Sequence, residues 1–428
     1  MSASTPTRVS ERMLVFLIGA VQFVNILDFV MVMPLGPDFA HGLGIPVSKL
    51  GLVGGSYTLA AAGAGLAGSL FLDRYDRRSA LAVAMTGLSL GTFAGGLATG
   101  LPTLLGARVL AGVFGGPATS LSLSIVADAV PAERRGKALG AVMGAFSVAA
   151  VLGVPVSLKL AEWAGWRAPF FAVAALGLLI TAGTIALLPP MRAHLEAKGR
   201  NLSPTPSLFR RTVVQSYVMT AVVMGAGFLL IPNLSAYVQA NLGLPRSALW
   251  TLYGAGGLVS FVSLRLVGKL VDRLGSFRVG TAGAVLMACA VWLAFVDVPP
   301  HPPVLLLFLF FMFALSVRNV SYSTLTSKVP LPAERARFMS FQSAVQHLSS
   351  AAGAITSALV LAEGPGGRLL HVRRLAALSL VLTAALPSLL LRVERAVGRG
   401  PDPAPPSPET QTDLGPPPAG MARPLKKV

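Results

Sequence analysis

Apolar runs long enough to cross a membrane recur along almost the whole chain, and this feature constrains the fold most strongly. A transmembrane helix needs about 20 consecutive apolar residues. The chain is 54% hydrophobic and only 12% charged, with a mean hydropathy of +0.69, which excludes an ordinary soluble globular protein. We therefore expect an all-α integral membrane protein with twelve transmembrane helices. The predicted spans are 13–36, 47–71, 79–99, 103–127, 139–161, 168–189, 213–238, 248–268, 279–297, 303–327, 339–361 and 373–392.

The distribution of Lys and Arg predicts the orientation of these spans, because short cytoplasmic loops retain basic residues. With the N-terminus inside, 25 of the 35 Lys and Arg residues fall on the inner side and 6 on the outer side. Both termini are then cytoplasmic, in a multi-pass protein of a prokaryotic plasma membrane. This asymmetry and the attraction of anionic lipid headgroups account for the net charge of +18. The basic clusters are scattered and form no continuous face for nucleic acid.

The two halves of the chain repeat the same motifs. An Asp-Arg pair follows the second and the eighth span, and Pro-Ala-Glu-Arg precedes the fifth and the eleventh. Parallel repeats of this kind place a substrate site between them, near the middle of the membrane. We expect an N-terminal six-helix lobe at 1–189, a cytoplasmic linker at 190–212, a C-terminal six-helix lobe at 213–393 and a disordered, proline-rich cytoplasmic tail at 394–428.

Several of these segments resemble motifs of the major facilitator superfamily. GSLFLDRYDRR (68–78) and GKLVDRLGSFR (268–278) look like its loop signature, although Ser69 and Asp76 depart from the usual pattern. LLGARVLAGVFGG (104–116) is similar to the fourth-helix motif of proton-coupled members, and VLGVPVSLKLAEWAGWRAPFF (151–171) looks like the antiporter motif of the fifth helix. ILDFVMVMPLGP (26–37) resembles the first helix of the drug:proton antiporter 1 branch, which includes exporters similar to arabinose efflux permeases.

The resemblance implies the major facilitator fold and a set of residues that gate it. Pro155, which follows Gly153 closely, is expected to bend the fifth helix. The resemblance implies that this bend contacts the second helix and limits leak, although simple close packing explains the same residues equally well. The gating residues implied are Asp73, Arg74, Gly268, Asp272 and Arg273 in the two loops, with Gly153 and Pro155 in the bend.

A carboxylate, Asp28, stands near the middle of the first apolar run. A charge there costs about 2.5–3.5 kcal/mol on insertion, so it is expected to be neutralised, paired or placed in a water-filled cavity. Arg108, in the fourth span, is its natural partner because an arginine cannot give up its proton. We expect these two residues to couple transport to protons. The alternatives are a permanently paired structural carboxylate and an arginine that snorkels to the outer surface.

Other polar residues within the spans are weaker candidates for a substrate cavity, since each could equally form an interhelical hydrogen bond. Two of them precede Asp28 on the same helix face and extend it into a polar stripe. The candidates are Gln22, Asn25, Tyr57, Gln215, Tyr217, Asn233, Tyr237, Arg318, Gln342, Gln346 and His347.

These features together predict a secondary active transporter that works by alternating access. We expect a monomer that exports a small drug-like or sugar-like molecule in exchange for protons and has the lipid bilayer as its other partner. A proton-coupled importer and a non-transporting membrane scaffold or receptor are the alternatives, and two costly charges in the bilayer favour transport over a scaffold. No nucleotide-binding loop, metal-ligand spacing or nucleophile elbow is present, so we expect no enzyme activity, cofactor or metal. The sequence does not name the substrate.

Overall fold

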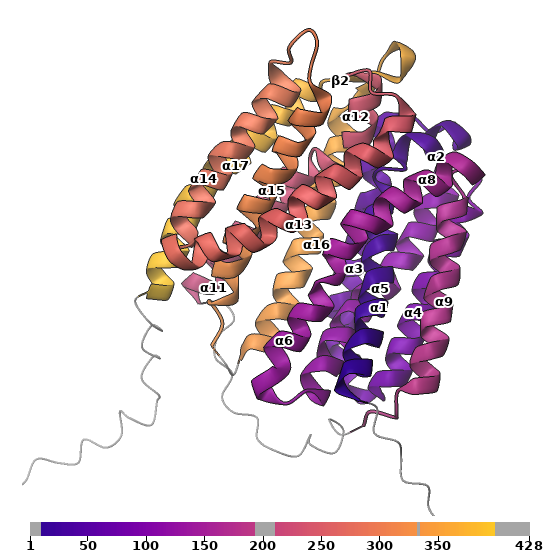
Figure 1. The fold of residues 1–428 in the computed structure, drawn as a ribbon, viewed down its shortest axis with the longest axis vertical. Coiled ribbons are helices and arrows are strands. Elements are labelled where there is room, and N and C mark those ends of the chain that lie inside the picture. The colour runs from indigo at the N-terminus through magenta and orange to yellow at the C-terminus, as the bar shows by residue number, and fades with distance from the viewer. Residues whose placement is uncertain (1–9, 193–209, 332–333, 399–428) are drawn as a thin grey trace, which may run out of the picture.

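The protein is a bundle of long helices in two groups (Figure 1). The computed structural model describes residues 10–192, 210–331 and 334–398. The first half contains α1 (Glu11–Val32), α2 (Gly36–Leu43), α3 (Leu50–Phe71), α4 (Arg77–Gly96), α5 (Leu101–Ala129), α6 (Ala132–Met143), α7 (Ala145–Val148), α8 (Val154–Ala164) and α9 (Ala168–Leu187). The second half contains α11 (Arg211–Phe228), α12 (Leu234–Ala240), α13 (Leu249–Leu274), α14 (Ser276–Val291), α15 (Val304–Ser327), α16 (Arg335–Val360), β1 (Ala362–Glu363), β2 (Leu369–Leu370) and α17 (Val372–Gly398).

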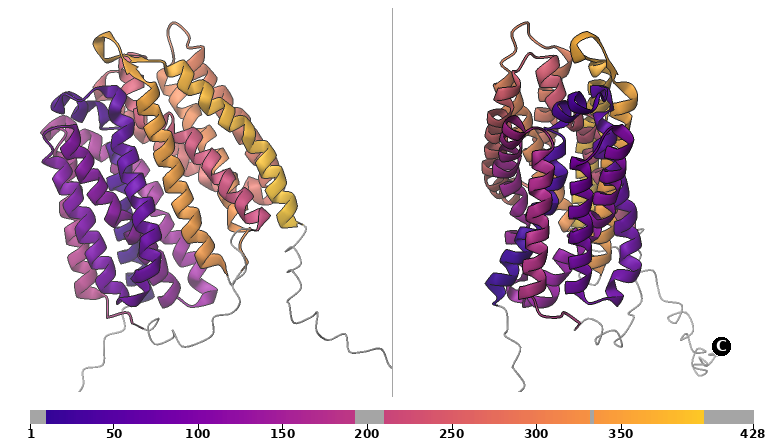
Figure 2. Two further views of the ribbon diagram at one scale, coloured as in Figure 1. Left: turned by 180° about the vertical axis from the view of Figure 1, so that it is seen from behind. Right: turned by 90° about the vertical axis from the view of Figure 1, so that its right-hand side faces the viewer.

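The expected all-α membrane fold is confirmed. In the described residues, 11 helical segments are long and apolar enough to cross a membrane. The remaining long helix, α16, has 26 residues but carries Gln342, Gln346 and His347. It lies between the two groups of helices and packs against α3 and α11 (Figure 2). This position keeps much of α16 away from lipid, which explains why the helix tolerates polar residues.

Local chemistry sets where the helices begin and end. The side chain of Ser10 accepts a hydrogen bond from the amide of Met13 and so starts α1. Pro34 follows α1 and cannot donate to a helix, so the first span ends at Val32, four residues before its predicted end. α17 continues to Gly398, so residues 394–398 are helical rather than part of the predicted tail. The rest of that tail and most of the predicted linker lie outside the described residues.

The fifth predicted span is bent, as its Gly-Val-Pro sequence suggested. It contains α6, α7 and a π-helical turn at Ala149–Gly153, and α8 follows with Pro155 in its first turn. The extra residue of a π turn accommodates the proline without breaking the helix. In the part of the chain that the structure describes, the bend packs mainly against α1 and α13 rather than α3. The implied contact between the second and fifth helices is therefore not a main contact of this conformation.

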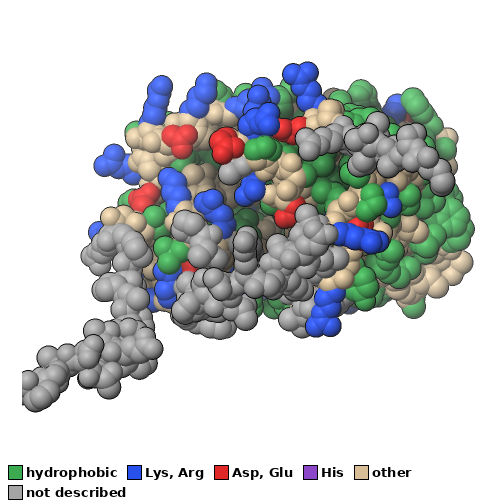
Figure 3. All heavy atoms as spheres, turned by 90° about the horizontal axis from the view of Figure 1, so that it is seen from below, with side chains coloured by type: hydrophobic (Ala, Val, Ile, Leu, Met, Phe, Trp, Pro, Cys, Tyr) green, Lys and Arg blue, Asp and Glu red, His purple; other side chains and the backbone are tan. Residues whose placement is uncertain are grey.

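One end of the bundle is rich in basic side chains. We call the end at which the chain enters and leaves the segment 193–209 the linker side, and the opposite end the far side. Viewed from the linker side, the molecule shows many Lys and Arg side chains with fewer acidic ones among them (Figure 3). These are the basic residues from which we expect that side to be cytoplasmic, and the orientation stays a prediction.

The two halves share one apolar core at the far side. One apolar core includes most of the first half and the far-side parts of second-half helices, for example Leu249 and Phe311. The linker-side part of the second half has its own core, which includes Met219, Phe338 and Leu390. Every hydrogen bond and ion pair described between the halves also lies at the far side. The described structure is thus closed at the far side and more weakly joined at the linker side.

Candidate functional site

Asp28 and Arg108 form a buried ion pair inside the first half. Arg108 Nη1 lies 2.9 Å from Asp28 Oδ1 and 3.1 Å from Oδ2. The side chains are 0% and 1% exposed, respectively. Arg108 therefore pairs with the carboxylate and does not snorkel. A buried pair gains Coulomb energy in a low dielectric, but separating it leaves a costly single charge. The pair can therefore part only if another group, such as a proton or a ligand, replaces one partner.

Thr92 of α4 completes the coordination of Asp28. Its hydroxyl oxygen lies 2.7 Å from Asp28 Oδ1 and 2.9 Å from the carbonyl oxygen of Leu88. A hydroxyl has one proton to donate and two lone pairs that accept. It can donate to ionised Asp28, or accept from protonated Asp28 while it donates to Leu88. The three helices α1, α4 and α5 thus hold a carboxyl group that has hydrogen-bond partners in both protonation states.

An aromatic stack connects this ion pair to the second half. The guanidinium of Arg108 lies 4.6 Å from the ring centre of Tyr57, a distance at which a cation is attracted to the ring face. Tyr57 stacks on Phe29 at 5.2 Å, and Phe29 stacks on Phe228 of α11 at 6.1 Å. The stack runs from the charged pair in the first half to α11 in the second. A movement of one half against the other must break or rearrange it.

The polar stripe of α1 is used for helix packing rather than as an open cavity wall. Asn25 donates to the carbonyl of Gly115 at 3.0 Å and to Thr119 at 2.8 Å, and it accepts from the hydroxyl of Tyr57 at 3.1 Å. The neighbouring Gln22 is 1% exposed, and its carbonyl oxygen Oε1 has no described partner. The expectation that the stripe lines a cavity is therefore wrong for Asn25 in this conformation. Gln22 is the member of the stripe with capacity left for a ligand or water.

Glycines of α5 allow α3 to approach closely enough for these contacts. A Cβ atom on Gly112 would lie 2.3 Å from the backbone oxygen of Tyr57, and one on Gly115 would lie 2.2 Å from its hydroxyl. A Cβ on Gly116 would lie 2.6 Å from the backbone oxygen of Ala61. Small residues in lipid-embedded helices serve this purpose. The fourth-helix segment thus positions Arg108 and also presents a surface on which Tyr57 fits.

The polar candidates of the second half do not converge on one site. Asn233 donates to Ser357 at 2.8 Å, Tyr237 donates to the carbonyl of Ala294 at 2.7 Å, and Gln342 donates to Thr220. These three residues therefore form interhelical hydrogen bonds. Four others are at least partly exposed, and no hydrogen bond is described for any of their side chains; they are Gln215, Tyr217, Gln346 and His347. Arg318 is buried at 2% exposure within the second half.

The loop residues implied as gates lie at the linker side. Asp73 is in a short 3₁₀ turn after α3, and its side chain lies outside the described part of the structure. Arg74, Asp272 and Arg273 are exposed, and a Cβ on Gly268 would meet no atom within 4 Å. The side chain of Arg134, at the start of the fifth span, lies 3.1 Å from Glu11 of its own half. A contact between Asp272 and the start of the fifth span is thus not part of this far-side-closed conformation, and its role as a latch stays a prediction.

The bend of the fifth span contacts both halves. A Cβ on Gly153 would lie 2.7 Å from Leu27, the neighbour of Asp28. A Cβ on Gly254 of α13 would lie 3.5 Å from Pro155, and one on Gly257 would lie 2.6 Å from the backbone oxygen of Ala150. The bend therefore packs between the helix that carries Asp28 and a helix of the second half. Gly153 and Pro155 remain candidates for gating through these contacts.

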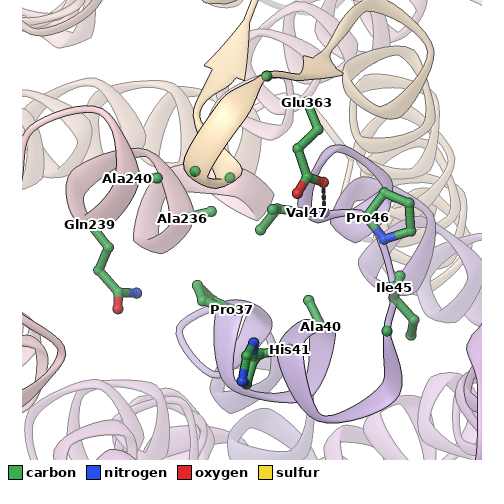
Figure 4. Close-up of a pocket in the computed structure, with 14 residues that line it drawn as sticks. Pro37, Ala40, His41, Ile45, Pro46, Val47, Ala236, Gln239, Ala240 and Glu363 are labelled. Carbon is green, nitrogen blue, oxygen red and sulfur yellow. Dashed lines mark hydrogen bonds between the residues drawn. The ribbon is translucent and has the colours of Figure 1, made fainter.

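A cavity of about 790 Å³ opens between the halves at the far side (Figure 4). His41 and Val47 line it from the first half, and Gln239 and Glu363 from the second. Glu363 accepts a hydrogen bond of 2.6 Å from the amide of Val47 across the cavity edge. Asp28 and Arg108 are not among the lining residues. We therefore associate this cavity with closure of the far side and not with the charged pair.

Several residues of the site carried no signal that we used in the sequence. Thr92 lies in a span rich in small residues, and only its position on the face toward α1 gives it a role. Phe29 and Phe228 look like ordinary apolar residues of a span. The tetrad Met-Pro-Leu-Gly before Asp38 does mark a helix break, which could have indicated that this carboxylate lies at the far surface. Asp38 forms an ion pair with Arg246 of the second half. Arg246 is 208 positions away and could not have been identified from spacing.

Comparisons with known proteins agree with this architecture. The family model described as "Major Facilitator Superfamily" matches residues 18–354. A chloramphenicol resistance protein of Streptomyces lividans is 30% identical over 346 residues, which are 78% of this chain and 86% of that protein. The solved structure of a bacterial homologue of the human lysosomal transporter Spinster, inward-facing and occupied, has a TM-score of 0.72 at 16% identity and covers 94% of this chain and 100% of its own. A D-xylose-proton symporter has a TM-score of 0.70 at 19% identity, with coverages of 88% and 96%. At such identities, the structural likeness establishes the fold alone.

Proposed function

Because the chain belongs to the major facilitator superfamily, we propose that it is a proton-coupled exporter of small, drug-like molecules. The superfamily match makes it a multi-pass secondary transporter and not an enzyme. The finer assignment, to the drug:proton antiporter 1 branch, rests on the segment 26–37 and on the relative named as a chloramphenicol resistance protein. We further propose that it resides in a prokaryotic plasma membrane as a monomer, with both termini in the cytoplasm.

The buried pair of Asp28 and Arg108 is the observation that carries this proposal. A fully enclosed carboxylate with an arginine at 2.9 Å is stable while ionised. Protonation would release Arg108 from its partner, and Thr92 can then accept a hydrogen bond from the neutral acid. The pair thus has two arrangements that differ by one proton. A scaffold or receptor gains nothing from such a device in the membrane interior.

Coupling requires that these two arrangements favour different conformations of the transporter. The stack of Tyr57, Phe29 and Phe228 links the pair to α11. A displacement of Arg108 moves the cation that lies over Tyr57 and so changes the contact between the halves. Each state-specific difference of about 1.4 kcal/mol changes the ratio of the two conformations roughly tenfold. We propose that Asp73 and Asp272 stabilise the state in which the linker side is closed.

The test measures proton-driven transport in inside-out vesicles over a panel of labelled drugs and sugars. Asp28→Asn keeps the size of the side chain but cannot release a proton. It should abolish accumulation driven by the pH gradient and retain energy-independent exchange. Asp297→Asn, which neutralises an exposed carboxylate at the far side, serves as the control and should transport like the wild type.

Wild-type accumulation by Asp28→Asn would remove this residue from the coupling mechanism. The direction of transport is measured in the same vesicles. Proton-driven movement out of inside-out vesicles, rather than into them, would replace the proposed exporter with the importer.

A further inference from the structure

The second half contains a buried arginine that has no counter-charge among the described residues. Arg318 lies in the middle of α15 and is 2% exposed. Its Nε and Nη1 atoms are enclosed and have no hydrogen-bond partner among the described residues. Arg108, by contrast, uses its Nη1 to bind both oxygens of Asp28. Since an arginine stays protonated in proteins, Arg318 is a buried positive charge.

No carboxylate of the second half can approach Arg318 from a neighbouring span. The sequence has no Asp or Glu in 211–271, 273–296, 298–333, 335–362 or 364–393. The five acidic residues that interrupt or follow these segments lie near helix ends or between helices; they are Asp272, Asp297, Glu334, Glu363 and Glu394. Three of them are already engaged: Glu334 pairs with Arg210, Glu363 accepts from the amide of Val47, and Glu394 accepts from the amide of Phe277.

The position opposite Arg318 corresponds roughly to that of Asp28 in the first half. α11 is the first helix of its half, as α1 is, and its Gly227 lies near Arg318. A Cβ on Gly227 would lie 3.2 Å from Arg318 Nη2. The glycine leaves room for the guanidinium but offers it no charge. One half thus pairs its buried arginine internally, whereas the described residues of the other half give Arg318 no partner.

We propose that Arg318 binds an anionic oxygen group, such as a carboxylate, on the transported molecule. This inference rests on the proposed function and specifies its substrate class. A buried, unpaired guanidinium is costly by itself, and that cost is recovered when a carboxylate occupies its fork of donors. Gly227 precedes Phe228, the last ring of the aromatic stack. A substrate with an aromatic ring and a carboxylate matches both features, since its ring can stack while its anion meets Arg318.

The experiment compares binding of matched pairs to the purified full-length protein in detergent. Benzoate, phenylacetate and salicylate are each tested against their methyl esters by the rise in melting temperature. The wild type should bind each acid more tightly than its ester. Arg318→Gln should raise the half-saturating concentration of the acids at least about tenfold and leave that of the esters nearly unchanged. Arg318→Lys should retain part of the preference, and Arg395→Gln, at an exposed arginine of α17, should behave like the wild type.

Stability without ligand separates binding from a structural role. Removal of an unpaired buried charge should raise the melting temperature of Arg318→Gln above that of the wild type, whereas loss of a structural contact would lower it. A lower melting temperature, or equal binding of acids and esters by the wild type, would overturn the proposal. Equal stabilisation by chloride or inorganic phosphate that also depends on Arg318 would overturn it in favour of an inorganic-ion site. Because binding is measured without a proton gradient, failure of export in vesicles would affect the proposed function and not this inference.

Discussion

Arg246 of the second half lies 2.6 Å from the carboxylate of Asp38 in the first half, so the halves are joined by an ion pair at the far side. Arg246 also donates to the carbonyl of Leu158, at 3.1 Å. Both side chains are about three-quarters or more buried, at 24% and 20% exposure. Because these contacts join residues of different halves, they exist only while the far side is closed. They therefore favour the opposite state from the one that Asp73 and Asp272 are proposed to stabilise.

Asp38→Asn should shift the protein toward a far-side-open conformation. Loss of a state-specific contact worth about 1 kcal/mol changes the ratio of states by roughly fivefold. The measurement is maleimide labelling of a cysteine placed at His41, in a Cys289→Ser background, because Cys289 is the single cysteine. Glu162→Gln removes a far-side ion pair within one half and is the matched control. Equal labelling of both variants would show that Asp38 is no latch.

Arg108→Gln should destabilise the protein more than the double variant Asp28→Asn/Arg108→Gln. The single change leaves an uncompensated carboxylate, at a cost of about 3–5 kcal/mol, and the second change removes that charge. Thermal unfolding of the two single variants and the double variant forms a complete cycle. Additive losses would mean that the two residues do not interact as the distance of 2.9 Å implies.

Gly112→Ala and Gly106→Ala should have opposite effects although both lie in α5. A methyl group at 112 meets the backbone of Tyr57 at 2.3 Å, whereas one at 106 meets no atom within 4 Å. Gly106→Ala should therefore stabilise the helix by about 0.5–1 kcal/mol, and Gly112→Ala should lower the melting temperature and impair transport. A neutral Gly112→Ala variant would contradict the close packing of α3 on α5.

Asp76 should make stability depend on acid pH. Burial acts to raise the pKa of this carboxyl, but hydrogen bonds from the amides of Ser79 and Met191 and the charge of Arg192 outweigh it and lower the pKa. A carboxyl whose pKa is lower in the folded state stabilises the fold above its unfolded pKa of about 3.9, and this contribution is lost as the pH falls through the folded pKa. Asp76→Asn should thus unfold at a lower temperature than the wild type at pH 7. The difference should shrink toward pH 3, and a constant difference would argue against the charge.

The two ends of α15 should face opposite sides of the membrane. Cysteines are introduced singly at His301, which precedes this helix, and at Ser327, its last residue; both are exposed, and Cys289 is again removed. In intact cells, an impermeant maleimide should label the cysteine at 301 and should label that at 327 only after permeabilisation. The reverse pattern would invert the proposed orientation and place the basic face outside.

The sequence was sufficient for the fold and for the charged pair, but not for the surroundings of that pair. Apolar runs determine the number of spans because lipid leaves the backbone few alternatives to a helix. Asp28 and Arg108 could be paired because each relieves the cost of the other. Thr92 could not be found, since its role depends on which face of α4 meets α1. Asn25 looked available for a ligand, but Gly115 and Tyr57 occupy its hydrogen-bonding groups.

The separate apolar core at the linker side of the second half affects how unfolding measurements on this protein are read. The cluster around Phe338 and Leu390 shares no members with the large core that contains Leu249. Such a region can open locally at a lower free energy than the rest of the molecule. Amide hydrogens of the linker-side turns of α16 and α17 then exchange by sub-global opening, whereas those around Arg108 exchange only in the rare global event. Substitutions in the small core should therefore act on how often that end of the second half is transiently unfolded.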